Sequence, residues 1–221
     1  PVVYTITGKG TLSDKHPLNM GVVGLSASAP SAEAALREAD VVLLVGTKSP
    51  QGSTFLWTVP TLEQRVIHLD VDPAEIGRVF STEVGLVGDA KLGLEALQAE
   101  LLAGTTGGAE AEWVQGLKEK KEDWLDRREE LFASEDVPIK PYRIMGALNK
   151  VLAPDDILVC DAGFASGWGA LYYDQKEEGR RTLFPRGLAG LGFSVAAGIG
   201  AQLAAPGRRV ATLAGDAGFC Y

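Results

Sequence analysis

The residues best suited to chemistry in this sequence are Gly215-Asp216-Ala217, which directly follow the apolar run Val210–Ala214. That run is typical of a buried parallel strand, and α/β sheets bind ligands at the carboxyl ends of such strands. A carboxylate there needs a cation or backbone donors, and Asp with phosphate oxygens and water suits Mg²⁺. The small residues flanking Asp216, including Gly218, would let a phosphate approach the backbone. The alternative is that Asp216 only caps a following helix.

A segment rich in glycine and alanine precedes this strand. It reads Gly187-Leu-Ala-Gly190-Leu-Gly192-Phe-Ser-Val-Ala-Ala-Gly198-Ile-Gly200. Each glycine inside a helix costs about 1 kcal/mol relative to alanine. Several close together indicate either tight helix packing or close approach of a ligand to the backbone, and the sequence leaves both open.

Other catalytic arrangements are missing from the sequence. It has no Gly-x-Ser-x-Gly elbow, Walker loop or Gly-x-Gly-x-x-Gly motif after a strand. His16, in a loop-like context, and His68, inside an apolar run, favour structural roles over a zinc site or a nucleophile–histidine pair. Cys160 and Cys220 lie in separate apolar segments, which favours buried free thiols over a disulfide. A nucleophilic hydrolase is therefore not expected.

The charge balance excludes further classes. Lys and Arg number 21 against 29 Asp and Glu, a net charge of −8, so the basic footprint of a nucleic-acid-binding protein is missing. The chain has no run of 18 apolar residues and no export signal at its N-terminus. We therefore expect a cytoplasmic protein with neither a nucleic-acid nor a membrane partner.

In the first hundred residues, strand-like runs alternate with helix patterns. The predicted strands and helices are Val41–Val45, Val66–Val71, Ala32–Ala39 capped by Ser31, a short helix after Asp72-Pro73, and Ala90–Ala103 capped by Asp89. This alternation predicts an α/β fold with a doubly wound parallel sheet, Rossmann-like, over residues 1–104.

A linker and a second α/β pattern follow. Gly104–Gly108 predicts a flexible joint, and the charged stretch after it predicts a linker helix within residues 105–138. The second pattern, residues 139–221, stops soon after the strand at 210–214 with no crossover helix. We therefore expect an incomplete second domain, and a chain that is a slice of a larger protein.

Taken in order, these motifs resemble the thiamine diphosphate-dependent enzymes of the acetolactate synthase, benzoylformate decarboxylase and pyruvate oxidase group. The matching segments are Pro1–Gly10, His16–Gly21, Ala39–Gly46, Ile67–Gly77, Val87–Ala90, Asp161–Gly163, Gly190–Phe193, Ala196–Ala201 and Gly215-Asp216. The resemblance implies a middle domain at 1–104 followed by the N-terminal part of the diphosphate-binding domain at 139–221.

The resemblance also implies site residues. Asp216 would be the metal ligand, holding Mg²⁺ against the cofactor's diphosphate. Leu191 would lie under the bent cofactor, and the carbonyl of Ala189 would accept from its pyrimidine amino group. The implied cofactor-binding set is Gly163, Ala189, Leu191, Gly215, Asp216, Ala217 and Gly218.

Two family residues are not expected within this chain. The second metal ligand, an Asn, would lie beyond Tyr221, and the activating Glu would precede residue 1, so no catalytic residue is assigned and the chain alone should be inactive. Phe164 and Ala165 stand where acetolactate synthases carry Gln and His. This departure favours a decarboxylase or lyase relative.

The implied reaction makes or breaks a carbon–carbon bond next to the carbonyl of a 2-oxo acid, in a homo-dimer or homo-tetramer. Some relatives hold FAD or ADP in the middle domain. Thr5, Asp70 and Asp89 match positions near FAD, but Thr47-Lys48-Ser49 replaces an expected arginine. The alternative function is a nucleotide-binding module for FAD, NAD or ADP without thiamine chemistry, in which Asp216 is unimportant.

Overall fold

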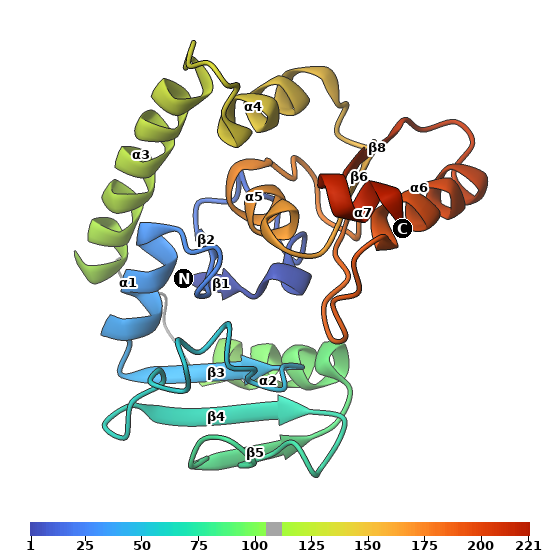
Figure 1. The fold of residues 1–221 in the computed structure, drawn as a ribbon. Helices are drawn as coiled ribbons and strands as arrows, with labels where there is room; N and C mark the ends of the chain where they lie inside the picture. The colour runs from blue at the N-terminus through green and yellow to red at the C-terminus, as the bar shows by residue number, and fades with distance from the viewer. Residues whose placement is uncertain (105–111) are drawn as a thin grey trace.

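The computed structural model describes residues 1–104 and 112–221 as an α/β protein in which every strand pairing is parallel (Figure 1). The strands are β1 (Val2–Tyr4), β2 (Asn19–Val22), β3 (Val41–Val45), β4 (Arg65–Asp70), β5 (Val84–Val87), β6 (Ile157–Cys160), β7 (Thr182–Leu183) and β8 (Val210–Leu213). The helices are α1 (Pro30–Glu38), α2 (Ala90–Gly104), α3 (Glu112–Phe132), α4 (Pro141–Val151), α5 (Phe164–Tyr172), α6 (Phe193–Ala204) and α7 (Asp216–Cys220), with a 3₁₀ turn at Ile6–Gly8.

The strands form three sheets, with the orders β1-β2, β3-β4-β5 and β7-β6-β8. In the second sheet Val41 lies opposite Arg65, and Ile67 lies opposite Val84. The parallel α/β class predicted from the alternating pattern is therefore confirmed. Helix α2 runs beside this sheet in Figure 1. The side chain of Leu69 occupies the space that a side chain on Gly93 of α2 would need, so the helix packs closely on β4.

Three local predictions in this half meet different outcomes. Asp89 does cap α2, because its Oδ1 accepts from the backbone N–H of Lys91 (2.9 Å) and of Leu92 (3.1 Å). Ser31 does not cap α1: Ala29 is the N-cap, and the Ser31 hydroxyl is buried and donates to the carbonyl of Met20 at 2.7 Å.

The short helix predicted after Asp72-Pro73 was also wrong. The segment is a turn in which Asp72 Oδ1 accepts from the Ala74 N–H at 2.9 Å. The same side-chain acceptor that can start a helix here closes a local turn, and no helix follows.

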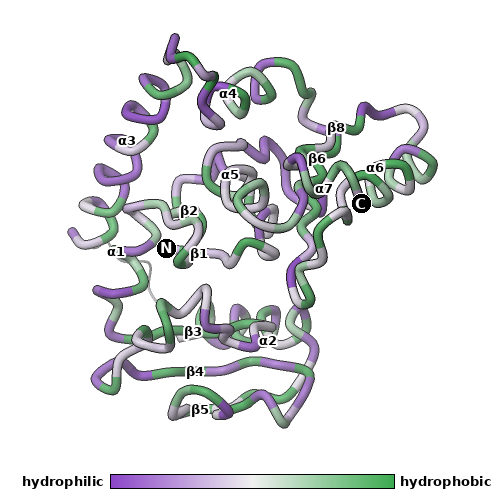
Figure 2. The backbone as a smooth tube through the Cα atoms, in the orientation of Figure 1, coloured by the Kyte–Doolittle hydropathy of each residue, from purple (hydrophilic) through white to green (hydrophobic). Residues whose placement is uncertain are grey.

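Helix α3 connects the two halves. Leu117 on its inner face is almost fully buried in a core formed with α1 and β2, and Trp113 donates to Glu38 of α1 at 3.0 Å. Figure 2 colours α3 mostly purple and α6 mostly green, so the linker helix is the more hydrophilic of the two. Apart from Gly104, the joint predicted at Gly104–Gly108 lies outside the described residues, as does the start of the predicted linker.

The third sheet is built around β6, whose four residues are all buried. Ile157 lies opposite Val210 of β8, and Leu158 lies opposite Thr182 of β7. Helix α6 packs on β8 at a point where a side chain on Gly198 would overlap Thr212. Part of the glycine-rich pattern is thus explained by helix packing.

Neither cysteine forms a disulfide within the described chain, as predicted. Cys160 is buried at the end of β6, whereas Cys220 is exposed on α7, so the expectation of a second buried thiol was wrong. Burial raises the pKa of the Cys160 thiol to about 12. Within residues 1–104 and 112–221, no helix has both the length and the apolar character needed to cross a membrane.

Candidate functional site

The parallel pairing of β6 with β8 brings two acidic segments to one edge of the third sheet. Cys160 lies opposite Leu213, and the Asp161 N–H donates to the Leu213 carbonyl at 2.9 Å. Asp161–Gly163 and Gly215–Gly218 therefore leave the sheet side by side at its carboxyl edge, where α/β folds bind ligands.

Asp216 is exposed at this edge. It is the first residue of α7, and Gly215 is the N-cap, with no side-chain capping bond. Its carboxylate makes neither a hydrogen bond nor an ion pair with any residue of the described ranges. The alternative that Asp216 caps the following helix is therefore wrong, and both carboxylate oxygens remain available to a cation.

Asp161 follows the neighbouring strand and is completely buried (0% exposed). Its Oδ1 accepts from the Ala162 N–H at 2.8 Å, and its Oδ2 accepts from the Gly192 N–H at 3.0 Å. The Ser166 hydroxyl donates to its carbonyl at 2.6 Å. Asp161 thus holds the glycine-rich loop, which continues into α6, against the end of β6.

The loop before α6 carries two of the expected site residues. Ala189 adopts a positive φ of 53°, and Gly192, the N-cap of α6, has a φ of 88°. Leu191 between them is 50% exposed. A side chain on Gly192 would lie 2.7 Å from Tyr221 Cβ and 3.6 Å from the Gly218 carbonyl, so this loop lies against α7.

The small residues at the edge fall into two groups. A Cβ added to Gly163 or to Gly215 would meet open space, and Gly163 has a φ of 76°. Ala217 is exposed. Gly218 is buried instead, and a Cβ there would overlap Asp161 Oδ2. Gly163, Gly215 and Ala217 therefore leave backbone open to a ligand, whereas Gly218 allows α7 to pack over Asp161.

All seven expected site residues thus lie on three adjacent segments at one edge of the sheet. Asp161 is the residue whose role the sequence did not reveal. The signal that singled out Asp216, an acidic residue soon after an apolar run of strand length, applies equally to Asp161. Only the fold shows which of the two side chains is buried.

The residues compared with flavin positions lie at other strand ends. Asp70 is buried at the end of β4 and accepts from the Asp72 N–H at 2.9 Å, while Asp89 caps α2. The Thr5 and Thr7 hydroxyls lie 3.3 Å apart after β1. The carboxylates of Asp70 and Asp89 both accept hydrogen bonds from nearby backbone N–H groups.

Two cavities lie away from the β6–β8 edge. One of about 650 Å³ opens between segments 57–66 and 79–83, near the start of β4. The other, of about 40 Å³, lies where α3 crosses the first residues of the chain. Neither is lined by any of the seven expected site residues.

The edge residues fit a metal-bridged diphosphate. No group of three or more potential side-chain metal ligands occurs among residues 1–104 and 112–221. A single free carboxylate suits a cation that takes its remaining ligands from phosphate oxygens and water, as Mg²⁺ commonly does. The open backbone at Gly163 and Gly215 leaves room for those phosphates.

Comparison with known proteins gives matches to both halves. Residues 1–97 match the family described as "Thiamine pyrophosphate enzyme, central domain". Residues 161–221 match "Thiamine pyrophosphate enzyme, C-terminal TPP binding domain". The second match begins at Asp161 and contains the whole β6–β8 edge.

Curated relatives align over almost the entire chain. It is 35% identical over 233 residues to the "Probable acetolactate synthase large subunit" of Methanocaldococcus jannaschii. This alignment covers 99% of this chain and 37% of that protein. It is 33% identical over 227 residues to the acetolactate synthase large subunit of Corynebacterium glutamicum, covering 99% and 34%. The corresponding protein of Parasynechococcus marenigrum is 31% identical over 217 residues, covering 98% and 34%. The chain thus spans about a third of the length of these relatives.

Proposed function

The chain belongs to the thiamine pyrophosphate enzyme family, and from that premise we propose that its β6–β8 edge binds the diphosphate of thiamine diphosphate through Mg²⁺ held by Asp216. The observation that carries the proposal is the exposed Asp216 carboxylate, without a partner in the described chain, beside open backbone at Gly163 and Gly215.

The chain's own residues would bind and orient the cofactor. Asp216 would ligate the metal, and Gly163, Gly215 and Ala217 would let the phosphates approach the backbone. The half-exposed Leu191 would contact the cofactor, and the Ala189 carbonyl would accept a hydrogen bond from its amino group. Asp161 would act indirectly, because its bond to Gly192 fixes the loop that carries both residues.

We further propose that the complete enzyme processes a 2-oxo acid. Bound thiamine diphosphate supplies a carbon nucleophile for attack on such a carbonyl. Holding the reacting groups in a fixed arrangement contributes much of the rate in reactions of this kind. The relatives named acetolactate synthase support this substrate class. We also propose that the complete enzyme is a homo-dimer or homo-tetramer in the cytoplasm.

Product analysis separates the two branches of this proposal. An acetolactate synthase-like enzyme supplied with pyruvate, thiamine diphosphate and Mg²⁺ would join two substrate molecules after loss of carbon dioxide. A decarboxylase-like enzyme would release an aldehyde instead. Phe164 and Ala165, in place of Gln and His, favour the second product.

Calorimetric titration of the complete polypeptide tests the cofactor site. Thiamine diphosphate should bind only when Mg²⁺ is present. Asp216→Asn should weaken this binding by about 100-fold, the loss of about 2.7 kcal/mol of binding free energy. The matched control is Asp126→Asn, which removes an exposed carboxylate from α3 and should leave binding unchanged.

Two results would overturn the proposal. Equal binding by the wild type and Asp216→Asn would remove Asp216 from the site. Binding of FAD, NAD or ADP by the complete polypeptide, without any binding of thiamine diphosphate, would establish the nucleotide-binding alternative.

A further inference from the structure

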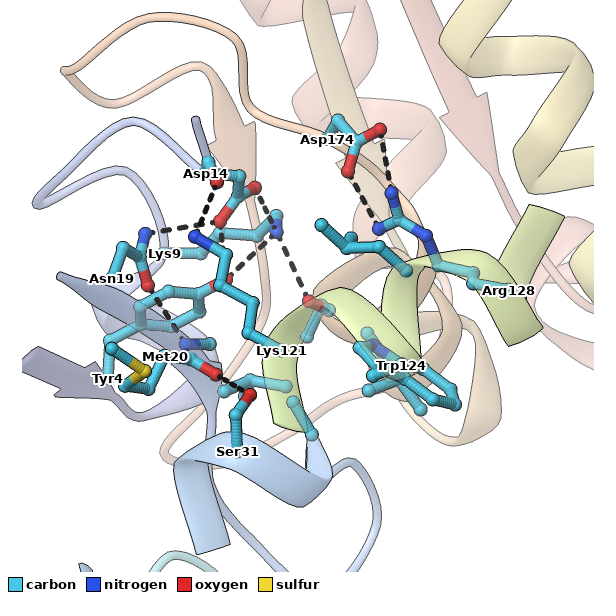
Figure 3. A pocket seen from close by; sticks show the side chains of 16 residues that line it. Tyr4, Lys9, Asp14, Asn19, Met20, Ser31, Lys121, Trp124, Arg128 and Asp174 are labelled. Atoms are coloured by element: carbon cyan, nitrogen blue, oxygen red, sulfur yellow. Dashed lines mark hydrogen bonds and ion pairs between the residues drawn. The ribbon is translucent and has the colours of Figure 1, made fainter. Parts of the chain in front are cut away.

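The cations around the small cavity beside α3 have partners within the protein (Figure 3). Lys9 Nζ donates to Asp14 Oδ2 at 2.8 Å. The Arg128 guanidinium pairs with the Asp174 carboxylate at 2.7 and 3.0 Å. Burial alone would raise the pKa of Asp14, but the Lys9 ammonium holds it below its ordinary value. Both of these cations therefore have a carboxylate beside them.

Arg186 is different, because its charge has no partner. The guanidinium makes neither a hydrogen bond nor an ion pair with any residue in the ranges 1–104 and 112–221. Its side chain is exposed, yet the surrounding protein lowers its pKa through desolvation, and no carboxylate in those ranges is near enough to oppose this effect. Because a guanidinium stays protonated in proteins, Arg186 presents an unbalanced positive charge.

The backbone that carries Arg186 is held in place. Phe184, directly after β7, packs against the cores that contain Tyr4 and Cys160. The Arg186 N–H donates to the Phe184 carbonyl at 3.0 Å, and Gly187 then turns the chain with a φ of 107°. The arginine therefore leaves the third sheet from a fixed point, at the start of the loop that leads to α6.

Arg186 and Asp216 lie on opposite sides of β6. The strand order is β7-β6-β8, and Arg186 follows the last residue of β7 by three positions, as Asp216 follows that of β8. Neighbouring strands are about 4.8 Å apart, so the two outer strands are separated by about 10 Å. The segments that leave this edge, 161–163, 184–192 and 214–221, contain one basic residue, Arg186. The edge therefore offers an acid on its β8 side and a single base on its β7 side.

This placement separates Arg186 from the expected diphosphate. In the proposed function the diphosphate lies on the β8 side, with Mg²⁺ at Asp216, whereas Ala189 and Leu191 would contact the reacting end of the cofactor. Arg186 precedes Ala189 by three residues on the same loop. The anion suited to this arginine therefore belongs to the molecule that reacts there.

A 2-oxo acid can offer more than one carboxylate to this cation. The carboxylate next to the carbonyl loses its charge as it leaves as carbon dioxide. A cation bound to it would stabilise the substrate more than the transition state, which slows the reaction. A second carboxylate further along the substrate keeps its charge throughout, so binding it orients the substrate without that penalty.

On the basis of the proposed function, we propose that Arg186 is a specificity-determining residue that binds the distal carboxylate of a 2-oxo dicarboxylic acid. The guanidinium can donate two parallel N–H bonds to one carboxylate, which adds geometric selectivity to the attraction between the charges. The complete enzyme therefore prefers substrates with this second acidic group to those with an apolar chain.

Two matched substrates test the preference. 2-Oxoglutarate and 2-oxopentanoate have the same chain and differ only in the distal group, a carboxylate or a methyl. Release of carbon dioxide by the complete enzyme should give a kcat/KM about 30-fold higher for 2-oxoglutarate, and Arg186→Leu should abolish this difference. Arg180→Leu is the matched control and should keep it. Arg180 is also exposed and without a side-chain partner in the described ranges, but it precedes β7 at the opposite end of the strand.

Calorimetric titration supplies a readout that needs no turnover. Glutarate carries two carboxylates, and pentanoate carries one on a chain of the same length. Glutarate should bind the cofactor-loaded wild type about 30-fold more tightly than pentanoate, and Arg186→Leu should bind the two equally. Thiamine diphosphate with Mg²⁺ should bind the wild type and Arg186→Leu with the same Kd. Their Tm values should also agree, because the Arg186 side chain makes no hydrogen bond within the described chain.

The results that overturn this role differ from those that overturn the cofactor site. A wild type that binds thiamine diphosphate without preferring the diacid contradicts the role of Arg186 alone, as does an Arg186→Leu variant that keeps the preference. Weaker binding of thiamine diphosphate by Arg186→Leu would assign the arginine to the diphosphate instead. A wild type that binds no thiamine diphosphate would remove the cofactor site, and the role of Arg186 would fall with it.

Discussion

The ends of β6 and β8 lie at the same carboxyl edge of one parallel sheet but present their carboxylates in opposite ways. Asp161, after β6, is fully buried and accepts from two backbone N–H groups. Asp216, after β8, is exposed and makes no polar contact within the described chain. Two acidic residues at the same edge therefore have different tasks: the first organises the loops, and the second remains available to a ligand.

The difference shows that position at a sheet edge does not by itself identify a ligand-binding carboxylate. What distinguishes the two is whether the protein already satisfies the acceptor. A carboxylate with its acceptors filled by backbone donors stabilises the fold, and one without partners can accept a cation.

Replacement of the buried carboxylate should have the largest effect on stability. Asp161→Ala removes two charge-assisted hydrogen bonds and leaves the Gly192 N–H without its acceptor, so the free energy of unfolding should fall by about 3 kcal/mol. Urea denaturation of the complete polypeptide measures this. Asp216→Ala should change the same quantity by less than about 0.5 kcal/mol. Similar losses in the two variants would remove the distinction between the two carboxylates.

A carboxylate far from the edge extends the comparison, because Asp14 is also satisfied internally. Asp14→Asn leaves the buried Lys9 without its counter-charge and should destabilise the protein by about 2 kcal/mol at pH 7. The pKa of Asp14 is lower in the native state than its ordinary value of 3.8, so the ionised carboxylate stabilises the native state at pH values above 3.8. This contribution is lost as the pH falls through the lower pKa of the native state. The difference between variant and wild type should therefore shrink below about pH 4 in urea titrations. A difference independent of pH would contradict this role for the charge.

The two glycines that flank Asp216 provide a smaller and sharper contrast. Gly218→Ala places a methyl group against Asp161 Oδ2, which its bond to Gly192 holds in place, and should cost about 1.5 kcal/mol. Gly215→Ala meets open space and has an ordinary backbone conformation, so its effect on stability should be below about 0.5 kcal/mol. Thermal unfolding of both variants checks this, and equal losses would show that α7 does not pack over Asp161.

The sequence predicted the elements whose signal is local. The runs predicted as strands at 41–45 and 66–71 form β3 and β4, at Val41–Val45 and Arg65–Asp70. Asp89 caps α2 because its carboxylate lies next to the N–H groups that it accepts from. Asp216 was placed correctly after a strand, because an apolar run of strand length is a local signal. The burial predicted for that strand was wrong, since β8 is only partly buried among the described residues.

The remaining features depend on contacts between distant segments. Serine is a residue type that often caps helices, but the Ser31 hydroxyl donates to the Met20 carbonyl instead. This contact exists only after β2 packs beside α1. Asp161 faces inward because Gly192 and Gly218 meet it from segments 31 and 57 residues away. The bonds from Lys121 to the Asp14 and His16 carbonyls exist only once α3 lies across the N-terminal segment.

Metal binding by the complete polypeptide tests the central claim most directly. Mn²⁺ can replace Mg²⁺, and its free form is measured by electron paramagnetic resonance while thiamine diphosphate is added. The account predicts that the wild type removes one Mn²⁺ per chain from solution only when the cofactor is present, and that Asp216→Asn leaves the free Mn²⁺ signal unchanged. Equal cofactor-dependent uptake by the wild type and Asp216→Asn would contradict it.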